Sequence, residues 1–203
     1  MSHNTWLHKI SRTLIVKPLV RTAVHPNHLT IARLVTGVGA FCSISFGASP
    51  WLQIGSVCFL VSILFDRADG DLARLTGRTS SSGHKLDLMS DAFCNSMIFV
   101  GLGIGLSHSH SAYGLGAIVM GLVAGMSVAA ILGMVIKVES LQGARAAELG
   151  SAAGFDPDDA MCVVPIAVFF EFGEGLLLLA AIGAPCFAVF FFIVFRRKIF
   201  LRE

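Results

Sequence analysis

Charged residues are scarce in this chain. Only 14% of its 203 residues are Asp, Glu, Lys or Arg, whereas a soluble domain carries about a quarter. Hydrophobic residues make up 55% of the chain, and the mean hydropathy is +0.77. This balance argues against an ordinary soluble domain. It predicts a single domain, residues 1–203, whose helices are surrounded by lipid.

The chain also lacks any pairing pattern among its cysteines. The five Cys residues stand singly inside apolar runs, at positions 42, 58, 94, 162 and 186. No two have the spacing of a zinc site, and an odd number argues against a disulfide framework. We expect all five to behave as small buried hydrophobic residues.

Residues 1–25 do not have the pattern of a cleavable signal peptide, because Lys and Arg interrupt the apolar residues and no clear cleavage site follows. Trp6, Ile10 and Leu14 recur at helical spacing with basic residues between them. This pattern predicts a short helix lying in the membrane interface. A frayed basic tail is the alternative.

Six apolar segments follow, and their lengths suit membrane helices of roughly 17 to 25 residues. The fifth is the weakest, since it is short and contains Glu171. The sequence therefore predicts an all-α membrane protein of six transmembrane helices with both termini on one side. The predicted spans are residues 29–47, 51–66, 88–106, 113–136, 157–172 and 175–195.

The positions of the charges test this topology. All Lys and Arg residues fall within 9–33, 67–85, 137–145 and 196–202, and the turns near 48–50, 107–112 and 173–174 have none. With six spans, the four basic groups and all eight Asp residues lie on the same face. Since basic residues mark the cytoplasmic side, we expect that face and both termini to be cytoplasmic.

Two pairs of glycines have the spacing of close helix contacts in lipid, Gly101 with Gly105 and Gly121 with Gly125. Small residues at this spacing let two helix backbones approach one another. The partner helix could belong to a second copy of the chain or to the same chain.

The most informative stretch is 66–91, DRADGDLARLTGRTSSSGHKLDLMSD. Asp66 and Asp69 are three residues apart, and Asp87 and Asp91 are four apart, so each pair shares one helix face. The linker between the two helices is short, which predicts that they are antiparallel neighbours. Salt bridges to nearby Arg and Lys residues are the ordinary alternative, but this spacing is more demanding than such pairing needs.

Four carboxylates close together repel one another unless cations neutralise them. Their hard oxygen ligands suit Mg²⁺, Mn²⁺ or Ca²⁺. A pair of such ions can clamp a diphosphate. Gly70, Ala73 and Gly83 have almost no side chain and would leave room for a bulky substrate.

This stretch resembles the signature of the CDP-alcohol phosphatidyltransferase family, D-x-x-D-G-x-x-A-R-x8-G-x3-D-x3-D. The segment 26–30, Pro-Asn-His-Leu-Thr, which leads into Arg33, is also similar to the family. With six spans, the resemblance covers most of the chain. Every fixed position of the signature matches, namely Asp66, Asp69, Gly70, Ala73, Arg74, Gly83, Asp87 and Asp91.

The resemblance implies an activity. Family members cleave the diphosphate of a CDP-linked alcohol, usually CDP-diacylglycerol, release CMP and join the phosphatidyl group to a hydroxyl acceptor. It also implies a six-helix homodimer with a polar cavity open to the cytoplasm. The acceptor stays open among glycerol 3-phosphate, inositol phosphate, inositol, serine and similar polar alcohols.

The resemblance further implies roles for individual residues. The four aspartates of the signature would bind two Mg²⁺ or Mn²⁺ ions, and Asp91 would also be the general base. The cytidine diphosphate would lie against Gly70, Ala73, Arg74 and Gly83, with Asn27 and Thr30 touching the nucleotide. Arg145 and Lys137 would bind an anionic acceptor, although cytoplasmic topology alone also explains these two charges.

An acidic cluster departs from the family pattern. Members that use phosphorylated acceptors often have a basic residue near the start of the fifth span, where this chain has Asp156, Asp158 and Asp159. The departure weighs against a phosphorylated acceptor. Asp156 before Pro157 also fits a helix N-cap, while the roles of the other two stay open.

Two other functions use similar residues. An intramembrane prenyltransferase also binds Mg²⁺ through Asp clusters, but that class has more spans and two separate Asp-rich motifs; it would release pyrophosphate instead of CMP. A divalent-cation carrier would need polar residues through the membrane centre, and these spans are nearly all apolar there.

Overall fold

The structure is a computed structural model that describes residues 6–109, 111–142 and 161–200. Within these ranges the protein is all-α and has no strand, as the sequence predicts. The helical elements are α1 (Trp6–Ser11), the π-helical turn η1 (Arg12–Val16), α2 (Lys17–Leu19), α3 (Pro26–Ile44), α4 (Trp51–Thr76), α5 (Ser81–His108), α6 (Gly116–Gln142), α7 (Val163–Phe169) and α8 (Gly173–Phe200).

The ends of α3, α4 and α5 are set by local sequence. His25 caps α3 through a reciprocal hydrogen-bond pair with His28. At the end of α4, Gly77 adopts a left-handed conformation with φ of 67°, which glycine tolerates. The Ser80 hydroxyl then accepts a hydrogen bond of 3.0 Å from Gly83 N and caps α5. These caps confine the link between α4 and α5 to residues 77–80.

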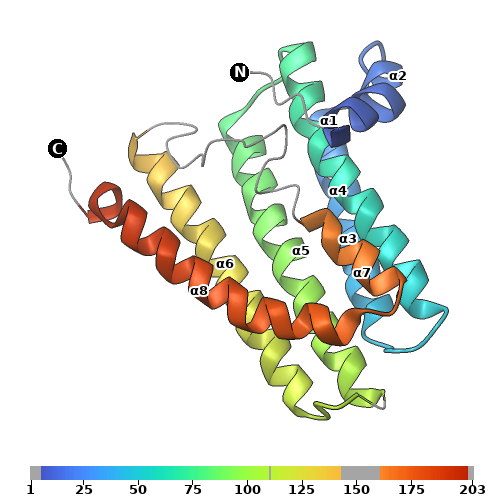
Figure 1. The fold of residues 1–203 in the computed structure, drawn as a ribbon. Helices are drawn as coiled ribbons and strands as arrows, with labels where there is room; N and C mark the ends of the chain where they lie inside the picture. The colour runs from blue at the N-terminus through green and yellow to red at the C-terminus, as the bar shows by residue number, and fades with distance from the viewer. Residues whose placement is uncertain (1–5, 110, 143–160, 201–203) are drawn as a thin grey trace.

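Helices α3, α4, α5 and α6 alternate in direction, while α8 runs obliquely in the same general direction as α6 (Figure 1). Helix α3 packs on both α4 and α5, α6 packs on α5 and α8, and the short α7 packs on α4. Helices α4 and α5 are antiparallel, but their direct contact is minor. The prediction that they are neighbours is therefore wrong, because α3 lies between them.

Three groups of buried apolar residues hold the described helices together; one, Val138 with Phe191 and Phe195, joins α6 to α8, and the other two adjoin α3. The larger of these two lies among α3, α4, α5, α6, α7 and α8 and includes Ile44, Phe59, Ile98 and Leu102. The smaller joins the N-terminal segment to α3 and α4, and its buried members are Val16, Leu29, Ala68 and Leu72. The smaller group lies directly beside the aspartate-bearing end of α4.

The N-terminal segment 6–19 is built from the short helical elements α1, η1 and α2, and the interfacial helix stays a prediction. The segment is fixed to α4 by a hydrogen bond of 3.1 Å from the Ser11 hydroxyl to Leu64 O, and by buried Val16. Ile10 and Leu14 are exposed. Their exposure suits contact with lipid, but the location of the segment in a membrane interface stays a prediction.

Among the described residues, four helices are long and apolar enough to cross a membrane, α4, α5, α6 and α8. Helix α3 covers most of the predicted first span but is not among them. The predicted fifth span, 157–172, begins outside the described residues, and α7 has only seven residues. Such a helix is about 10 Å long, against a hydrocarbon core of about 30 Å. Six spans therefore stay a prediction.

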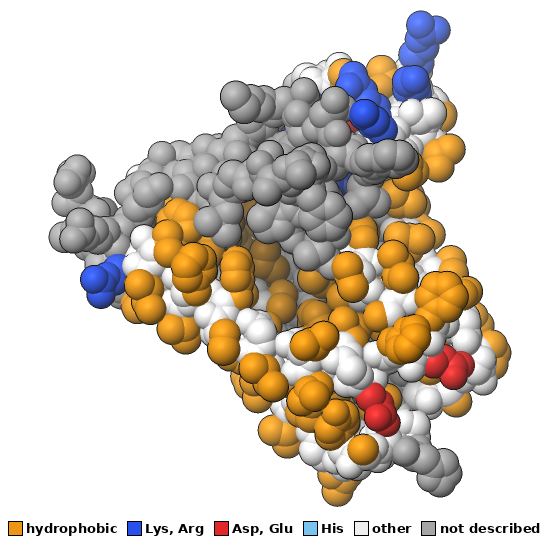
Figure 2. Space-filling model, in the orientation of Figure 1, with side chains coloured by type: hydrophobic (Ala, Val, Ile, Leu, Met, Phe, Trp, Pro, Cys, Tyr) orange, Lys and Arg blue, Asp and Glu red, His pale blue; other side chains and the backbone are white. Residues whose placement is uncertain are grey.

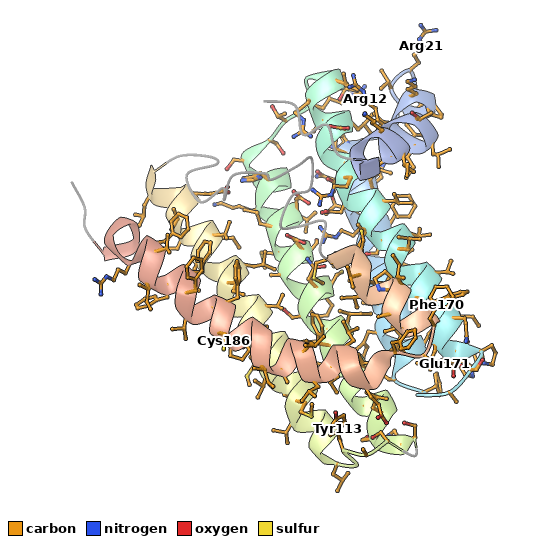
Figure 3. All side chains as sticks on the ribbon, in the orientation of Figure 1. Arg12, Arg21, Tyr113, Phe170, Glu171 and Cys186 are labelled. Carbon is orange, nitrogen blue, oxygen red and sulfur yellow. The ribbon has the colours of Figure 1, made fainter. Side chains whose placement is uncertain are left out.

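The surface separates apolar from basic side chains. Hydrophobic side chains cover the middle and lower parts of the face in Figure 2, while Lys and Arg side chains gather at its upper end and beside the end of α8. Arg12 and Arg21 lie at the upper end, and Glu171 lies near the opposite end (Figure 3). The charge pattern expected from the sequence therefore has a counterpart in the fold.

Both glycine pairs pack within the chain. A Cβ on Gly121 would lie 2.6 Å from Phe99 O of α5, and one on Gly125 would lie 2.7 Å from Ser96 O. A Cβ on Gly101 would lie 3.0 Å from Phe41 O of α3. The helix that each glycine pair packs against therefore belongs to the same chain and not to a second copy.

At the end of the bundle farthest from the aspartates, the main chains of two segments are in direct contact. Gly47, with φ of 70°, follows α3 and lies against Gly105 of α5. A Cβ on either residue would overlap main-chain atoms of the other segment. Helices α3 and α5 therefore meet there without intervening side chains.

We expect Gly121→Ala to lower the free energy of unfolding by about 1–3 kcal/mol, because its methyl group would overpack against the α5 backbone. Gly133→Ala is the matched control, since it lies on the same helix with nothing within 4 Å of its Cβ position. Thermal unfolding of the purified protein in detergent measures both. Equal melting temperatures would contradict the close α5–α6 contact.

Candidate active site

Three helices bring their charged residues together at one end of the bundle. Helix α4 contributes Asp66 and Asp69, helix α5 contributes Asp87 and Asp91, and α3 contributes Arg33. The spacing of each aspartate pair turns both carboxylates toward α3. Because α3 lies between α4 and α5, its arginine reaches both pairs.

The guanidinium of Arg33 is the centre of this cluster. Its Nη1 forms an ion pair with Asp66 Oδ1, and its Nη2 donates to Asp91 Oδ1 at 2.6 Å. Nη1 also lies 3.6 Å from Asp87 Oδ1. The Arg33 side chain is only 2% exposed, so its charge is balanced by these carboxylates and not by water.

Neutral polar side chains also donate hydrogen bonds to two of these carboxylates. The Thr30 hydroxyl donates to Asp69 Oδ2 at 2.7 Å, and both residues are buried. Asn95, one turn after Asp91, donates its Nδ2 proton to Asp91 Oδ1 at 2.5 Å. Asp69 and Asp91 are thereby fixed by donors from α3 and α5.

Small residues adjoin this cluster. A Cβ on Gly83 would lie 2.9 Å from Asn27 Oδ1, so the start of α5 touches the start of α3. A Cβ on Gly70 would make only ordinary contacts, the nearest 3.6 Å from the Arg74 guanidinium. Arg74 is itself held by Asp71 at 2.7 Å.

A comparison with protein families identifies the chain. The model of the CDP-alcohol phosphatidyltransferase family matches residues 23–195. This chain belongs to that family. It is therefore a phosphotransferase of phospholipid biosynthesis and, with its four apolar helices, an integral membrane protein. No curated protein matches the chain.

CDP-alcohol phosphatidyltransferases generally depend on divalent cations. The carboxylates of this member suit such ions, because their oxygens are hard ligands and because four negative charges face one buried guanidinium. Asp87 Oδ1 is buried and accepts no hydrogen bond. Among the described residues, however, no three His, Cys, Asp or Glu side chains are close enough to share one ion. Arg33 lies where they would converge.

Most of the residues implied by the family resemblance adjoin this cluster. The four aspartates surround Arg33 and Thr30, while Asn27 adjoins Gly83 and Arg74 adjoins Gly70. Ala73 is half-buried on α4. Lys137 is exposed near the end of α6. Arg145, Asp156, Asp158 and Asp159 lie outside the described residues.

Two residues of the cluster were not predicted from the sequence. Arg33 was named with the family-like stretch that precedes it and among the basic residues that set topology, but no role at the site was predicted for it, although a lone arginine inside an apolar helix is itself a signal of a functional site. Asn95 lies four residues after Asp91, at the spacing of a same-face helix pair. Its polar amide within an apolar segment was the available signal.

We expect Thr30→Val to lower the free energy of unfolding by about 1–3 kcal/mol, because the buried Asp69 carboxylate would lose a hydrogen-bond donor. Thr30→Ser keeps the hydroxyl and is the control, so its melting temperature should stay close to that of the wild type. Thermal unfolding in detergent with EDTA compares the three proteins. A valine variant as stable as the serine variant would show that this hydrogen bond adds nothing to stability.

Proposed function

We propose that this protein transfers a phosphatidyl group from CDP-diacylglycerol to the hydroxyl group of a small polar alcohol and releases CMP. The observation that carries the proposal is the meeting of the signature's four aspartates around one end of α3, in a chain whose family transfers such groups. The acceptor is glycerol 3-phosphate, inositol phosphate or another polar alcohol.

The reaction is a displacement at the phosphorus nearest the lipid. The acceptor oxygen forms a bond to this phosphorus, and the bond from phosphorus to the bridging oxygen of the diphosphate breaks. CMP leaves with that bridging oxygen, and the hydroxyl proton passes to a base. Two Mg²⁺ or Mn²⁺ ions bound by Asp66, Asp69, Asp87 and Asp91 would neutralise the phosphate charges.

Asp91 is the proposed base. Arg33 and Asn95 both donate to its Oδ1, so Oδ2 can accept the proton of the acceptor hydroxyl. Both donors also fix the direction of the carboxylate, which general-base catalysis requires.

The cytidine diphosphate is proposed to bind where α3, α4 and α5 begin or end near the cluster. The half-exposed Arg74 guanidinium, 3.6 Å from the Cβ position of Gly70, suits a phosphate group. The proposed cytidine diphosphate site also includes Asn27, Ala73 and Gly83. Thr30 belongs to the same site, although its hydroxyl donates to Asp69.

The proposed acceptor site lies near the end of α6, and the protein is proposed to form a homodimer. His84 Nε2 lies 3.9 Å from Glu139 Oε2, so the end of α6 adjoins the start of α5. This proximity supports an acceptor site that includes Lys137 and Arg145. The site and both termini would face the cytoplasm. A homodimer would use other surfaces than the two glycine pairs, since these pack within the chain.

Purified protein in detergent with CDP-diacylglycerol, Mg²⁺ or Mn²⁺ and a panel of hydroxyl acceptors tests the proposal. We expect CMP to form with one class of acceptor and to stop with EDTA. The proposal would be contradicted if none of the acceptors yielded CMP, or if the protein instead released pyrophosphate from a prenyl diphosphate.

We expect Asp91→Asn to retain binding of the CDP donor while CMP formation falls by about 10²–10⁴-fold, the range for loss of a general base. Glu174→Gln, at the opposite end of the protein where Glu174 accepts from Ala112 N, should keep wild-type turnover. Steady-state CMP release and equilibrium binding of the donor separate the two effects. Turnover by Asp91→Asn at the wild-type rate would rule out the base assignment.

We expect Gly70→Ala to leave the melting temperature unchanged, because the new methyl group would meet no protein atom closer than 3.6 Å. Its effect should be on the substrate, with a KM for CDP-diacylglycerol raised about tenfold or more by the lost space, worth about 1.4 kcal/mol. Gly39→Ala, with open space at its Cβ position, is the control. An unchanged KM for Gly70→Ala would show that the nucleotide does not approach this position.

A further inference from the structure

Arg33 is a buried charge in an otherwise apolar stretch of α3. Its side chain is 2% exposed, and its backbone oxygen accepts a hydrogen bond of 3.0 Å from the Ser62 hydroxyl of α4. A buried arginine is costly unless carboxylates pair with it. In this protein the partners come from two different helices, Asp66 of α4 and Asp91 of α5.

The same carboxylates are the proposed ligands of the divalent ions. Asp66 Oδ1 and Asp91 Oδ1 face the guanidinium, and Asp87 Oδ1 is 3.6 Å from it. A divalent ion that binds these oxygens must share them with Arg33 or displace it. Two positive centres at this separation repel strongly in a buried site.

We infer that Arg33 is a built-in counter-cation, which holds α4 and α5 around α3 when no metal is bound and competes with divalent metal for Asp66 and Asp91. The inference rests on the proposed function, because it takes the aspartates as the metal ligands. Arg33 is in this view a positioning residue that lowers the metal affinity and keeps the metal-free site assembled.

Two opposing effects decide whether removing Arg33 strengthens or weakens metal binding. Arg33 keeps the carboxylates near one another, which favours metal binding, but its positive charge disfavours a second cation. The first effect is the smaller one, because Thr30 and Asn95 also orient Asp69 and Asp91. Removing Arg33 should therefore tighten metal binding while it destabilises the metal-free protein.

The test compares Arg33→Gln, Arg33→Lys and Lys85→Gln with the wild type in detergent. Lys85 is exposed two residues before Asp87, so its substitution removes the same charge near the site without removing the buried pairing. Mn²⁺ binding is measured by electron paramagnetic resonance of the free ion, and unfolding is followed by heating in EDTA. Neither readout depends on catalytic activity.

We expect Arg33→Gln to bind Mn²⁺ at least about tenfold more tightly and to melt at a clearly lower temperature in EDTA, with saturating Mn²⁺ restoring most of the loss. Lys85→Gln should match the wild type in both measurements, because exposed charges are screened. Arg33→Lys keeps the positive charge but loses the planar guanidinium, which reaches carboxylates on two helices at once. Its Mn²⁺ affinity should therefore stay near that of the wild type, while its melting temperature in EDTA should be lower.

Unchanged or weaker Mn²⁺ binding by Arg33→Gln would overturn the inference. If that variant cannot be purified, Arg33→Lys decides: a lower melting temperature in EDTA that Mn²⁺ restores supports the inference, and wild-type melting overturns it. Failure of the wild-type protein itself to bind Mn²⁺ would instead contradict the proposed function. The two failures are therefore distinguishable.

Discussion

Ion pairs made by a single residue, Arg33, hold together the end of this protein where the four aspartates lie. Helices α4 and α5 have little direct contact, and the guanidinium of Arg33 reaches carboxylates on both. In lipid, apolar side chains gain little by choosing a helix over a fatty acyl chain, so apolar packing alone does not fix how far apart two such helices lie. Charge pairing across α3 supplies that restraint where the aspartates are.

The aspartates themselves were predictable from the sequence. A spacing of three or four residues places two carboxylates on one helix face whatever the tertiary structure, so Asp66 with Asp69 and Asp87 with Asp91 follow from helix geometry. The family resemblance added the association of Asn27 with this region, and Asn27 does touch the Gly83 position. No periodicity in the sequence could have joined those two segments.

Other features were beyond sequence reasoning for physical reasons. A link of four residues, 77–80, suggests direct packing of α4 on α5, but it equally permits a third helix to enter between them, and α3 does so. Hydropathy measures composition, so it does not give the local conformation that ends α7 at Phe169 before a turn with Glu171 at φ of 64°. The chain turns there and continues as α8.

Contacts of two different kinds fix the two ends of the α3–α5 pair. Around the aspartates the contacts are made by side chains and charges, while at the far end Gly47 and Gly105 bring main chain against main chain. Rotamer changes can loosen the first kind but not the second. Main-chain contact therefore leaves α3 and α5 less freedom to separate at the far end than at the carboxylates, where the ion pair of Arg33 with Asp91 joins them.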